Sequence, residues 1–238
     1  FTDSWFSKDM IANKKPDHLK VAIVGAGPAG ISAAYHLLLQ GFNVEIFEAM
    51  EGPGGMASKG IPEYRLPLKV LMREAGIIEN LGGKLHYNQA LGRDFKLDDL
   101  FDKGFKAIFL ALGTQKGRLL RIKGEDPSLE GYMSGVEMLL DINNACMNGE
   151  VCQTFGDKVV VVGGGNVAMD CARSSLRMGA SEVHLVYRRT KDDMPADHEE
   201  IEDAIEEGIK FHFLTNPSSI TTEDGRVTGV EIVEMEQG

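Results

Sequence analysis

The sequence lacks the features that would place this chain in a membrane, in an oxidising compartment or on nucleic acid. It contains no apolar run near the roughly 20 residues that span a bilayer, and its first residues lack the pattern of an export signal. Cysteine occurs only as Cys146, Cys152 and Cys171, without C-x-x-C or metal-ligand spacing, so we expect reduced thiols, a cytoplasmic location and no bound metal. The formal charge of −11 argues against binding to nucleic acid or to an anionic membrane.

The sequence does contain two glycine fingerprints of the form G-x-G-x-x-G/A, each between an apolar run and an amphipathic stretch. Their residues are Gly25, Gly27, Pro28, Ala29 and Gly30 in the first, and Gly163, Gly164, Gly165, Asn166, Val167 and Ala168 in the second. In such a turn the first glycine permits a tight bend, the second lets the backbone approach a pyrophosphate, and the third position packs helix against strand. Amide groups at the helix N-terminus then hold the phosphates. Two fingerprints therefore predict two bound dinucleotides.

Apolar strand patterns alternate with helical patterns along most of the chain. We expect strands at 20–24, 43–47, 84–87, 106–112, 158–162, 183–187 and 210–214, and helices at 28–40, 68–81, 97–103, 135–148, 166–178 and 196–207. The runs 219–222 and 227–235 flank a turn signal and predict a hairpin. Uniformly apolar strands that alternate with helices are typical of parallel sheets covered on both faces. The predicted fold class is α/β, with two Rossmann-like doubly wound nucleotide-binding domains.

The domain boundaries follow from these repeated βαβ units. Residues 1–19 are expected to form an arm or linker, residues 20–153 the first nucleotide-binding domain and residues 154–238 the second, with the junction near 150–157. The acidic stretches from Asp192 to Glu207 could dock a partner, but a solvated helix face is the favoured interpretation.

The residues at the end of the second strand of each unit distinguish the two dinucleotides. Glu48 stands about 20 residues after the first fingerprint, where an acidic side chain hydrogen-bonds ribose hydroxyls. In the second unit the equivalent place is filled by Tyr187-Arg188-Arg189. A carboxylate there would repel a 2′-phosphate, whereas two guanidinium groups can bind it through charge-assisted hydrogen bonds. The second unit is therefore expected to bind NADP(H) rather than NAD(H).

Several separated motifs, in a fixed order, carry a resemblance to a known family. They are Gly25–Gly30 with Glu48, Gly54-Gly55, Gly60-Ile-Pro-Glu-Tyr-Arg-Leu-Pro67, Leu110-Ala-Leu-Gly-Thr114, Ser134-Gly-Val-Glu137, Gly163–Asp170, and Tyr187-Arg-Arg-Thr190 with Met194-Pro-Ala196. Together they resemble the glutamate synthase small subunit family across nearly all of residues 15–238. The same module is similar to the flavin and NADPH domains of dihydropyrimidine dehydrogenase and to the large subunit of NADH-dependent ferredoxin:NADP oxidoreductase.

The resemblance implies FAD in the first unit and NADPH in the second. It implies that Glu48 binds the FAD ribose, that Gly55 and Met56 lie along the flavin's phosphates and ribityl chain, and that Arg65 contacts the flavin. Ala49 and Gly113 are further candidates at the FAD site, and the Gly164–Val167 turn is expected to hold the pyrophosphate of the nicotinamide dinucleotide.

The chain departs from the family in two ways. Such proteins carry iron–sulfur clusters in a cysteine-rich region before the linker, which is missing here, and they close the FAD domain with a later strand and a Gly-Asp motif. We therefore expect a fragment of something longer, with an FAD domain that is incomplete at its C-terminus. Iron–sulfur clusters would then lie on a neighbouring domain or subunit of the same complex.

The chemistry implied by the resemblance needs little from the protein beyond binding and orientation. The cofactors carry hydride transfer, so no catalytic acid, base or nucleophile is assigned. We expect a module that takes hydride from NADPH onto FAD and passes electrons to the iron–sulfur partner. Two alternatives stay open, namely a flavin monooxygenase or oxidase, and a non-catalytic module that senses redox state or scaffolds a complex through a bound dinucleotide.

Overall fold

A computed structural model describes residues 15–148 and 156–236. The chain divides into two compact units, residues 1–115 and 116–238, each with its own parallel sheet. The junction expected near 150–157 falls largely on residues 149–155, which lie outside the described residues, as does Cys152. The assignment of a ligand to each domain stays a prediction, because compact packing says nothing of what a domain binds.

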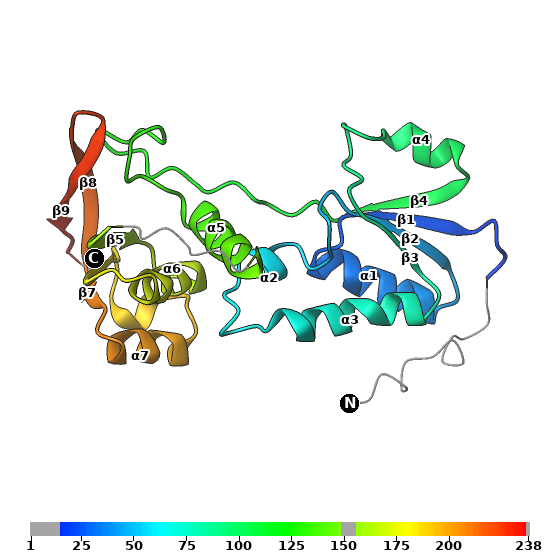
Figure 1. The fold of residues 1–238 in the computed structure, drawn as a ribbon, viewed down its shortest axis with the longest axis horizontal. Helices are drawn as coiled ribbons and strands as arrows, with labels where there is room; N and C mark the ends of the chain where they lie inside the picture. Colours follow the sequence, from blue (N-terminus) through cyan, green and yellow to red (C-terminus); the bar gives the residue numbers. More distant parts are fainter. Residues whose placement is uncertain (1–14, 149–155, 237–238) are drawn as a thin grey trace. The chain divides into compact units, whose positions relative to one another are not determined.

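The first unit is built on a sheet of parallel strands in the order β3-β2-β1-β4. Its elements in chain order are β1 (Lys20–Val24), α1 (Pro28–Leu39), β2 (Asn43–Phe47), α2 (Met56–Lys59), α3 (Leu68–Asn80), β3 (Lys84–His86), α4 (Leu97–Asp102) and β4 (Phe105–Leu110). Figure 1 shows α1 and α3 on one face of this sheet and α4 on the other. The chain thus forms the doubly wound arrangement that its apolar strands predict.

Alternating residues of β1 point to two different cores. Ile23 packs with Leu38 and Ile78 from the helices α1 and α3, whereas Val24 packs with Leu100 of α4 on the opposite face. All of these side chains are at most 3% exposed. Each one contributes about 1.5–3 kcal/mol through removal of apolar surface from water.

The second unit contains a parallel sheet in the order β5-β6-β7 and an antiparallel hairpin. Its elements are α5 (Gly135–Asn148), β5 (Lys158–Val162), α6 (Asn166–Arg177), β6 (Glu182–Val186), the short 3₁₀ turn η3 (Lys191–Asp193), α7 (His198–Glu206), β7 (Lys210–His212), β8 (Thr215–Glu223) and β9 (Arg226–Glu234). Buried residues of α6, α7 and the sheet form one core, in which Met169, Leu185 and Ala204 are fully inaccessible to water.

The hairpin between β8 and β9 is confirmed, and it is longer than predicted. Its first strand begins at Thr215, four residues before the expected start at Ser219. Glu223 pairs with Arg226 across Asp224 and Gly225, which both have positive φ values (+48° and +77°), as a two-residue hairpin turn requires.

The other predicted helices and strands are present, with ends shifted by no more than two residues. The helix expected from residue 196 begins at His198, because Asp197 caps it by accepting the Glu199 N–H at 3.0 Å. The elements α2 and η3 have no counterpart among the expectations, since a single turn carries too few residues for a periodic pattern.

Candidate dinucleotide-binding sites

The first glycine fingerprint forms the turn between β1 and α1. Gly25 has a φ of +106°, and its N–H donates to the Phe47 carbonyl at 2.8 Å. A Cβ atom on Gly25 would lie 2.3 Å from the Ala111 carbonyl oxygen, and one on Gly30 would lie 1.9 Å from the Gly25 carbonyl oxygen. Both positions require glycine, because no side chain fits where strand, turn and helix meet.

A second glycine loop lies against this turn. The Gly54 N–H donates to the Ala26 carbonyl at 2.8 Å. Gly55 has a φ of +52°, and a Cβ atom on it would lie 3.0 Å from the Cα of Gly27. Two glycine backbones in contact present a surface without side chains, which the phosphates of a dinucleotide can approach closely. Met56 follows directly as the first residue of α2.

Glu48 is buried at the end of β2 and holds the fingerprint turn by hydrogen bonds. Its carboxylate accepts the Ala26 N–H at 2.6 Å through Oε2 and the Met50 N–H at 2.9 Å through Oε1. The residue is 7% exposed, whereas the adjacent Ala49 is exposed. An ionised carboxylate offers about four acceptor sites, so these two bonds leave capacity for the hydroxyls of a ribose.

The remaining candidates of the first unit lie on other segments. Pro28 and Ala29 are exposed at the N-terminus of α1, and Gly113 is exposed just after β4 with a φ of +67°. Because β1, β2 and β4 are parallel, Gly113 lies at the same edge of the sheet as Gly25 and Glu48. Arg65 lies in the loop between α2 and α3, where its N–H donates to the Pro62 carbonyl at 2.9 Å, and its contact with a flavin stays a prediction.

The second fingerprint forms the turn between β5 and α6. Gly163 has a φ of +144°, and its N–H donates to the Val186 carbonyl at 3.1 Å. Gly164 lies against an aromatic ring, since a Cβ atom on it would be 2.4 Å from Cε2 of Tyr187. The third position of this turn is the buried Ala168, and a Cβ atom on Gly163 would lie 3.3 Å from its methyl group, a tight contact.

The segment before α7 folds onto the second fingerprint turn. The Ala196 N–H donates to the Gly164 carbonyl at 3.1 Å, and the Asp197 N–H donates to Oδ1 of Asn166 at 2.9 Å. Gly165 caps α6 in an extended conformation. Sequence reasoning noted Met194-Pro-Ala196 only as part of a resemblance, since nothing local to that segment indicates which turn it contacts.

The arginine pair of the second unit is exposed at the end of β6. Arg188 and Arg189 follow Tyr187, and the Leu214 N–H donates to the Arg189 carbonyl at 3.0 Å. Val167, at the start of α6, is 50% exposed. The parallel strands β5 and β6 bring the fingerprint turn and the arginine pair to the same edge of the sheet.

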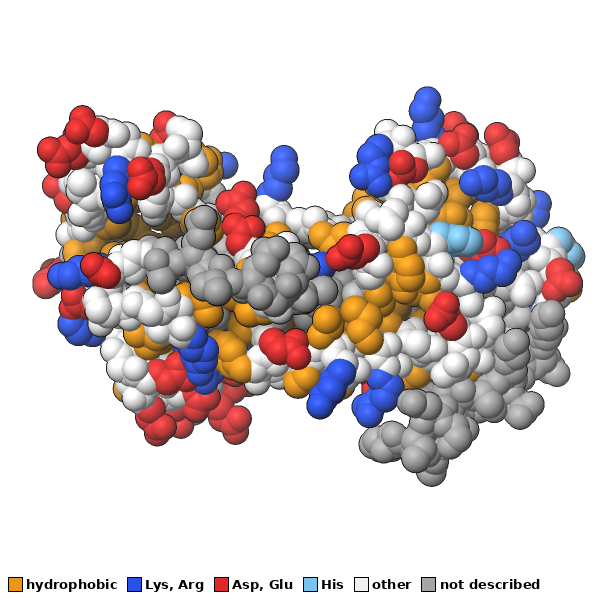
Figure 2. All heavy atoms as spheres, in the orientation of Figure 1, with side chains coloured by type: hydrophobic (Ala, Val, Ile, Leu, Met, Phe, Trp, Pro, Cys, Tyr) orange, Lys and Arg blue, Asp and Glu red, His pale blue; other side chains and the backbone are white. Residues whose placement is uncertain are grey.

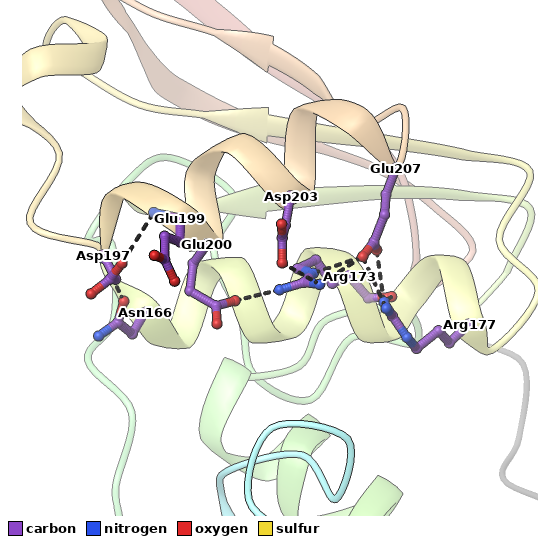
Figure 3. Close-up of polar contacts among 8 residues, drawn as sticks. All are labelled: Asn166, Arg173, Arg177, Asp197, Glu199, Glu200, Asp203 and Glu207. Carbon is purple, nitrogen blue, oxygen red and sulfur yellow. Dashed lines mark hydrogen bonds and ion pairs between the residues drawn. The ribbon is translucent and has the colours of Figure 1, made fainter.

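Helices α6 and α7, which follow this turn, are joined by a buried arginine. The Arg173 side chain is 8% exposed and forms ion pairs with Glu200, with Asp203 at 3.0 Å and with Glu207 at 2.7 Å, as Figure 3 shows. Arg177 also pairs with Glu207 at 2.7 Å. The hydrogen bond from Arg177, together with Arg173, lowers the pKa of Glu207 to about 2 against the opposing effect of burial.

The acidic stretch on α7 therefore has two different faces. Glu200 and Glu207 form ion pairs with Arg173. The expectation of a solvated helix face did not include these ion pairs. Glu199, Glu202 and Glu206 are exposed, and Figure 2 shows the acidic side chains gathered over this helix. The sequence signal for this pairing is Arg173 on α6, a buried position that the charged residues of α7 can reach.

The described cysteines are both free. Cys146 is exposed on α5, and Cys171 is buried on α6 with its thiol 3.4 Å from the Gly135 carbonyl. Burial and the nearby Asp170 raise the pKa of Cys171 to about 12, so its thiolate is scarce at neutral pH. Within residues 15–148 and 156–236, every helix is too short or too polar to cross a membrane.

Comparison with known proteins places these turns in context. A sequence profile described as pyridine nucleotide-disulphide oxidoreductase matches residues 19–238. The chain is 46% identical over 220 residues to the NADP(+)-dependent formate dehydrogenase subunit beta of Moorella thermoacetica, covering 92% of this chain and 30% of that protein. It is 36% identical over 226 residues to the glutamate synthase [NADPH] small chain of Escherichia coli strain K12, covering 92% and 47%. The chain thus spans less than half the length of these relatives, and the expected likeness to glutamate synthase small subunits is confirmed.

A solved structure shares the fold. Mycobacterium tuberculosis FprA in complex with NADPH matches with a TM-score of 0.75 at 20% identity, over 92% of this chain and 69% of that one. At this identity the likeness shows the fold alone. It confirms the Rossmann-type α/β class, and the chain covers only part of the matched structure.

Proposed function

The chain belongs to the pyridine nucleotide-disulphide oxidoreductase family, and from that premise we propose that it is a flavin-dependent oxidoreductase module that takes hydride from NADPH onto FAD. We propose further that electrons leave this module for iron–sulfur clusters on a neighbouring domain or subunit. The single observation that carries the proposal is the pair of glycine turns. A carboxylate is hydrogen-bonded to the first turn, and two exposed arginines lie at the same sheet edge as the second.

The first unit has the shape and charge that FAD requires. The contact between Gly27 and Gly55 gives a backbone surface on which no Cβ atom intervenes, and this surface suits a diphosphate. The Glu48 carboxylate stands beside it, anchored by the Ala26 N–H and able to accept ribose hydroxyls. These features, which all lie in the first unit, support the assignment of FAD to the domain predicted at residues 20–153, with Gly113 and Met56 at the margin of the same site.

The second unit has the charge that NADP(H) requires. Its turn at Gly163–Val167 opens α6, and Tyr187 takes the register position that Glu48 has in the first unit, so the exposed guanidinium groups of Arg188 and Arg189 follow one and two residues later. A 2′-phosphate would gain charge-assisted hydrogen bonds there. These features support the assignment of NADP(H) to residues 154–238.

The role proposed for the chain's own residues is to bind and orient the cofactors, and no catalytic acid, base or nucleophile is assigned among them. When bound, FAD would supply the redox chemistry, because a flavin can accept a hydride and release electrons one at a time. A dithiol relay like the one in the family's name is not part of the proposal, because the sequence has no C-x-x-C and the Cys171 thiol is held protonated by burial. The relay partner is a proposal that rests on relatives described as a beta subunit and a small chain. Free thiols and the use of NADPH lead us to propose a cytoplasmic location.

The test is the visible spectrum of the purified protein before and after anaerobic addition of NADPH. An oxidised flavin spectrum that bleaches would support both assignments. Bound flavin that NADPH does not reduce would overturn the enzyme proposal in favour of a redox-sensing or scaffold module. A colourless chain that binds NADPH would mean that flavin binding needs residues beyond this chain, and reconstitution with the longer protein would then decide the matter.

A further inference from the structure

The loop that carries the arginine pair is held by hydrogen bonds near both of its ends. We call residues 187–193 the arginine loop. At its start the Tyr187 N–H donates to the His212 carbonyl at 2.9 Å, and the Thr215 N–H donates to the Tyr187 carbonyl at 3.1 Å. The Leu214 N–H then holds the Arg189 carbonyl at 3.0 Å. These bonds join the arginine loop to the segment 212–215, so the protein itself sets the backbone conformation at Tyr187 and Arg189.

The end of the arginine loop is closed by Thr190 and Asp193. Oδ2 of Asp193 accepts the Thr190 hydroxyl at 2.6 Å and the Thr190 N–H at 3.2 Å. The Asp193 N–H returns a bond to the Thr190 carbonyl at 3.2 Å, and the Tyr187 hydroxyl donates to the Asp193 carbonyl at 2.7 Å. Thr190 and Asp193 therefore close the loop directly behind the two arginines.

The arginine loop is also joined to the fingerprint turn. The Tyr187 ring packs against Gly164, and the Ala196 N–H just beyond the loop holds the Gly164 carbonyl. Gly164 is thus held on two sides by the segment that carries Arg188 and Arg189. The distance between the pyrophosphate turn and the arginines is consequently fixed by packing and hydrogen bonds.

We propose that Thr190 and Asp193 are positioning residues for nucleotide choice, holding Arg188 and Arg189 where a 2′-phosphate must lie when the pyrophosphate sits on the Gly164 turn. The proposal rests on the proposed binding of NADP(H). Asp193 touches no ligand in this arrangement and acts through the loop. By charge alone it would oppose the 2′-phosphate, because a carboxylate repels an anion. Its placement there is explained by its bonds to Thr190.

An effect of charge and an effect of positioning would change the affinity for a 2′-phosphate in opposite directions. Asp192 is adjacent, exposed and of the same charge, but it has no side-chain hydrogen bond among the described residues. Asp192→Ala and Asp193→Ala each remove one negative charge near the arginines. If only charge matters, both variants should bind a 2′-phosphate more tightly. If Asp193 positions the loop, Asp193→Ala should bind it more weakly.

The experiment measures binding of adenosine 2′,5′-bisphosphate and of adenosine 5′-monophosphate by calorimetry, which needs no bound flavin. For Asp193→Ala we expect the affinity for the bisphosphate to fall about tenfold, with the monophosphate unchanged, since about one charge-assisted bond to the phosphate is lost. Asp192→Ala should leave the bisphosphate unchanged or slightly tighter. Equal effects of the two alanine variants, or tighter bisphosphate binding by Asp193→Ala, would overturn the proposal.

Thr190 provides the second measurement. Thr190→Val keeps the shape of the side chain and removes its hydroxyl, whereas Thr190→Ser keeps the hydroxyl. Thr190→Val should reduce the preference for the bisphosphate over the monophosphate, whereas Thr190→Ser should keep that preference. A general loss of stability would not produce this pattern. Replacement of Arg188 and Arg189 by alanine separates the positioning role of Asp193 from the assignment of NADP(H) to this unit. Loss of selectivity there without any loss in Asp193→Ala would refute positioning and leave the NADP(H) assignment standing.

Discussion

The two βαβ units use one plan of strands and helices but fix their nucleotide turns in different ways. In the first unit a buried carboxylate bonds the turn from inside, through the Ala26 N–H, and a second glycine loop presses against Gly27. In the second unit the turn is held from outside by the Tyr187 ring and the Ala196 N–H. The same fingerprint therefore specifies the bend and leaves its support to residues far away in the sequence.

The charged groups at the ends of the second strands differ in the same sense. Glu48 is 7% exposed and already hydrogen-bonded, whereas Arg188 and Arg189 are exposed to solvent. A carboxylate that accepts neutral hydroxyls forms hydrogen bonds with one charged partner and benefits from being held in place. Guanidinium groups that meet a phosphate form hydrogen bonds in which both partners are charged, and they can do so from a solvated position.

The largest expected effect tests the third position of each fingerprint. Gly30→Ala should destabilise the first unit by about 3 kcal/mol, because its Cβ would lie 1.9 Å from the Gly25 carbonyl oxygen, a backbone atom that cannot move aside. The matched change in the second unit, Ala168→Gly, should cost only about 1 kcal/mol from helix propensity. Chemical unfolding of both variants measures the difference. Equal costs would mean that the two turns are packed alike.

The elements of both units could be predicted from sequence, and the support of the turns could not. The runs at 21–24 and 159–162 are apolar throughout, so their assignment as strands of a parallel sheet needs no knowledge of partners, even though β5 has no fully buried residue. Glycines at the bends are required by local geometry. The bonds from Ala196 and Asp197 to the second turn depend on how a loop returns over a helix that begins about 30 residues earlier, and no local pattern encodes that.

The next-largest effect is expected when the arginine pair is removed, because this pair makes the charge of the second nucleotide site differ from that of the first. Replacing Arg188 and Arg189 together by alanine should raise the dissociation constant for NADPH about 100-fold, since two charge-assisted bonds are lost, and change that for NADH less than about threefold. Arg226→Ala removes an exposed arginine from the hairpin and serves as the control. Equilibrium binding of both nucleotides gives the answer. Equal losses for NADPH and NADH would contradict the role of the pair.

A smaller effect concerns how helices are joined in each unit. Helices α1 and α3 of the first unit meet through apolar side chains such as Leu38 and Ile78, whereas α6 and α7 meet through Arg173. Arg173→Met should cost about 2 kcal/mol, less than a fully buried pair, because water can reach the carboxylates left behind. Arg177→Met, whose side chain is 37% exposed in the parent, should cost less than about 1 kcal/mol. Unfolding in urea measures the free-energy cost of each variant. Equal costs would mean that the exposed Arg177 stabilises the helix pair as much as the buried Arg173 does.

The smallest expected effect is a difference in acid sensitivity between the two helix pairs. The folded pKa of Glu207 is about 2 against an ordinary value of 4.5, so its contribution is complete above about pH 4.5 and is lost as the pH falls toward 2. Glu45 in the first unit also has a lowered pKa, through His86 and Lys84 and against burial, but it joins strands rather than helices. Hydrogen exchange should therefore show α7 losing protection at a higher pH than α3. In Arg177→Met the main cause of the shift is removed, so the acid loss of α7 should become shallower, and an unchanged profile would mean that Glu207 does not link these helices.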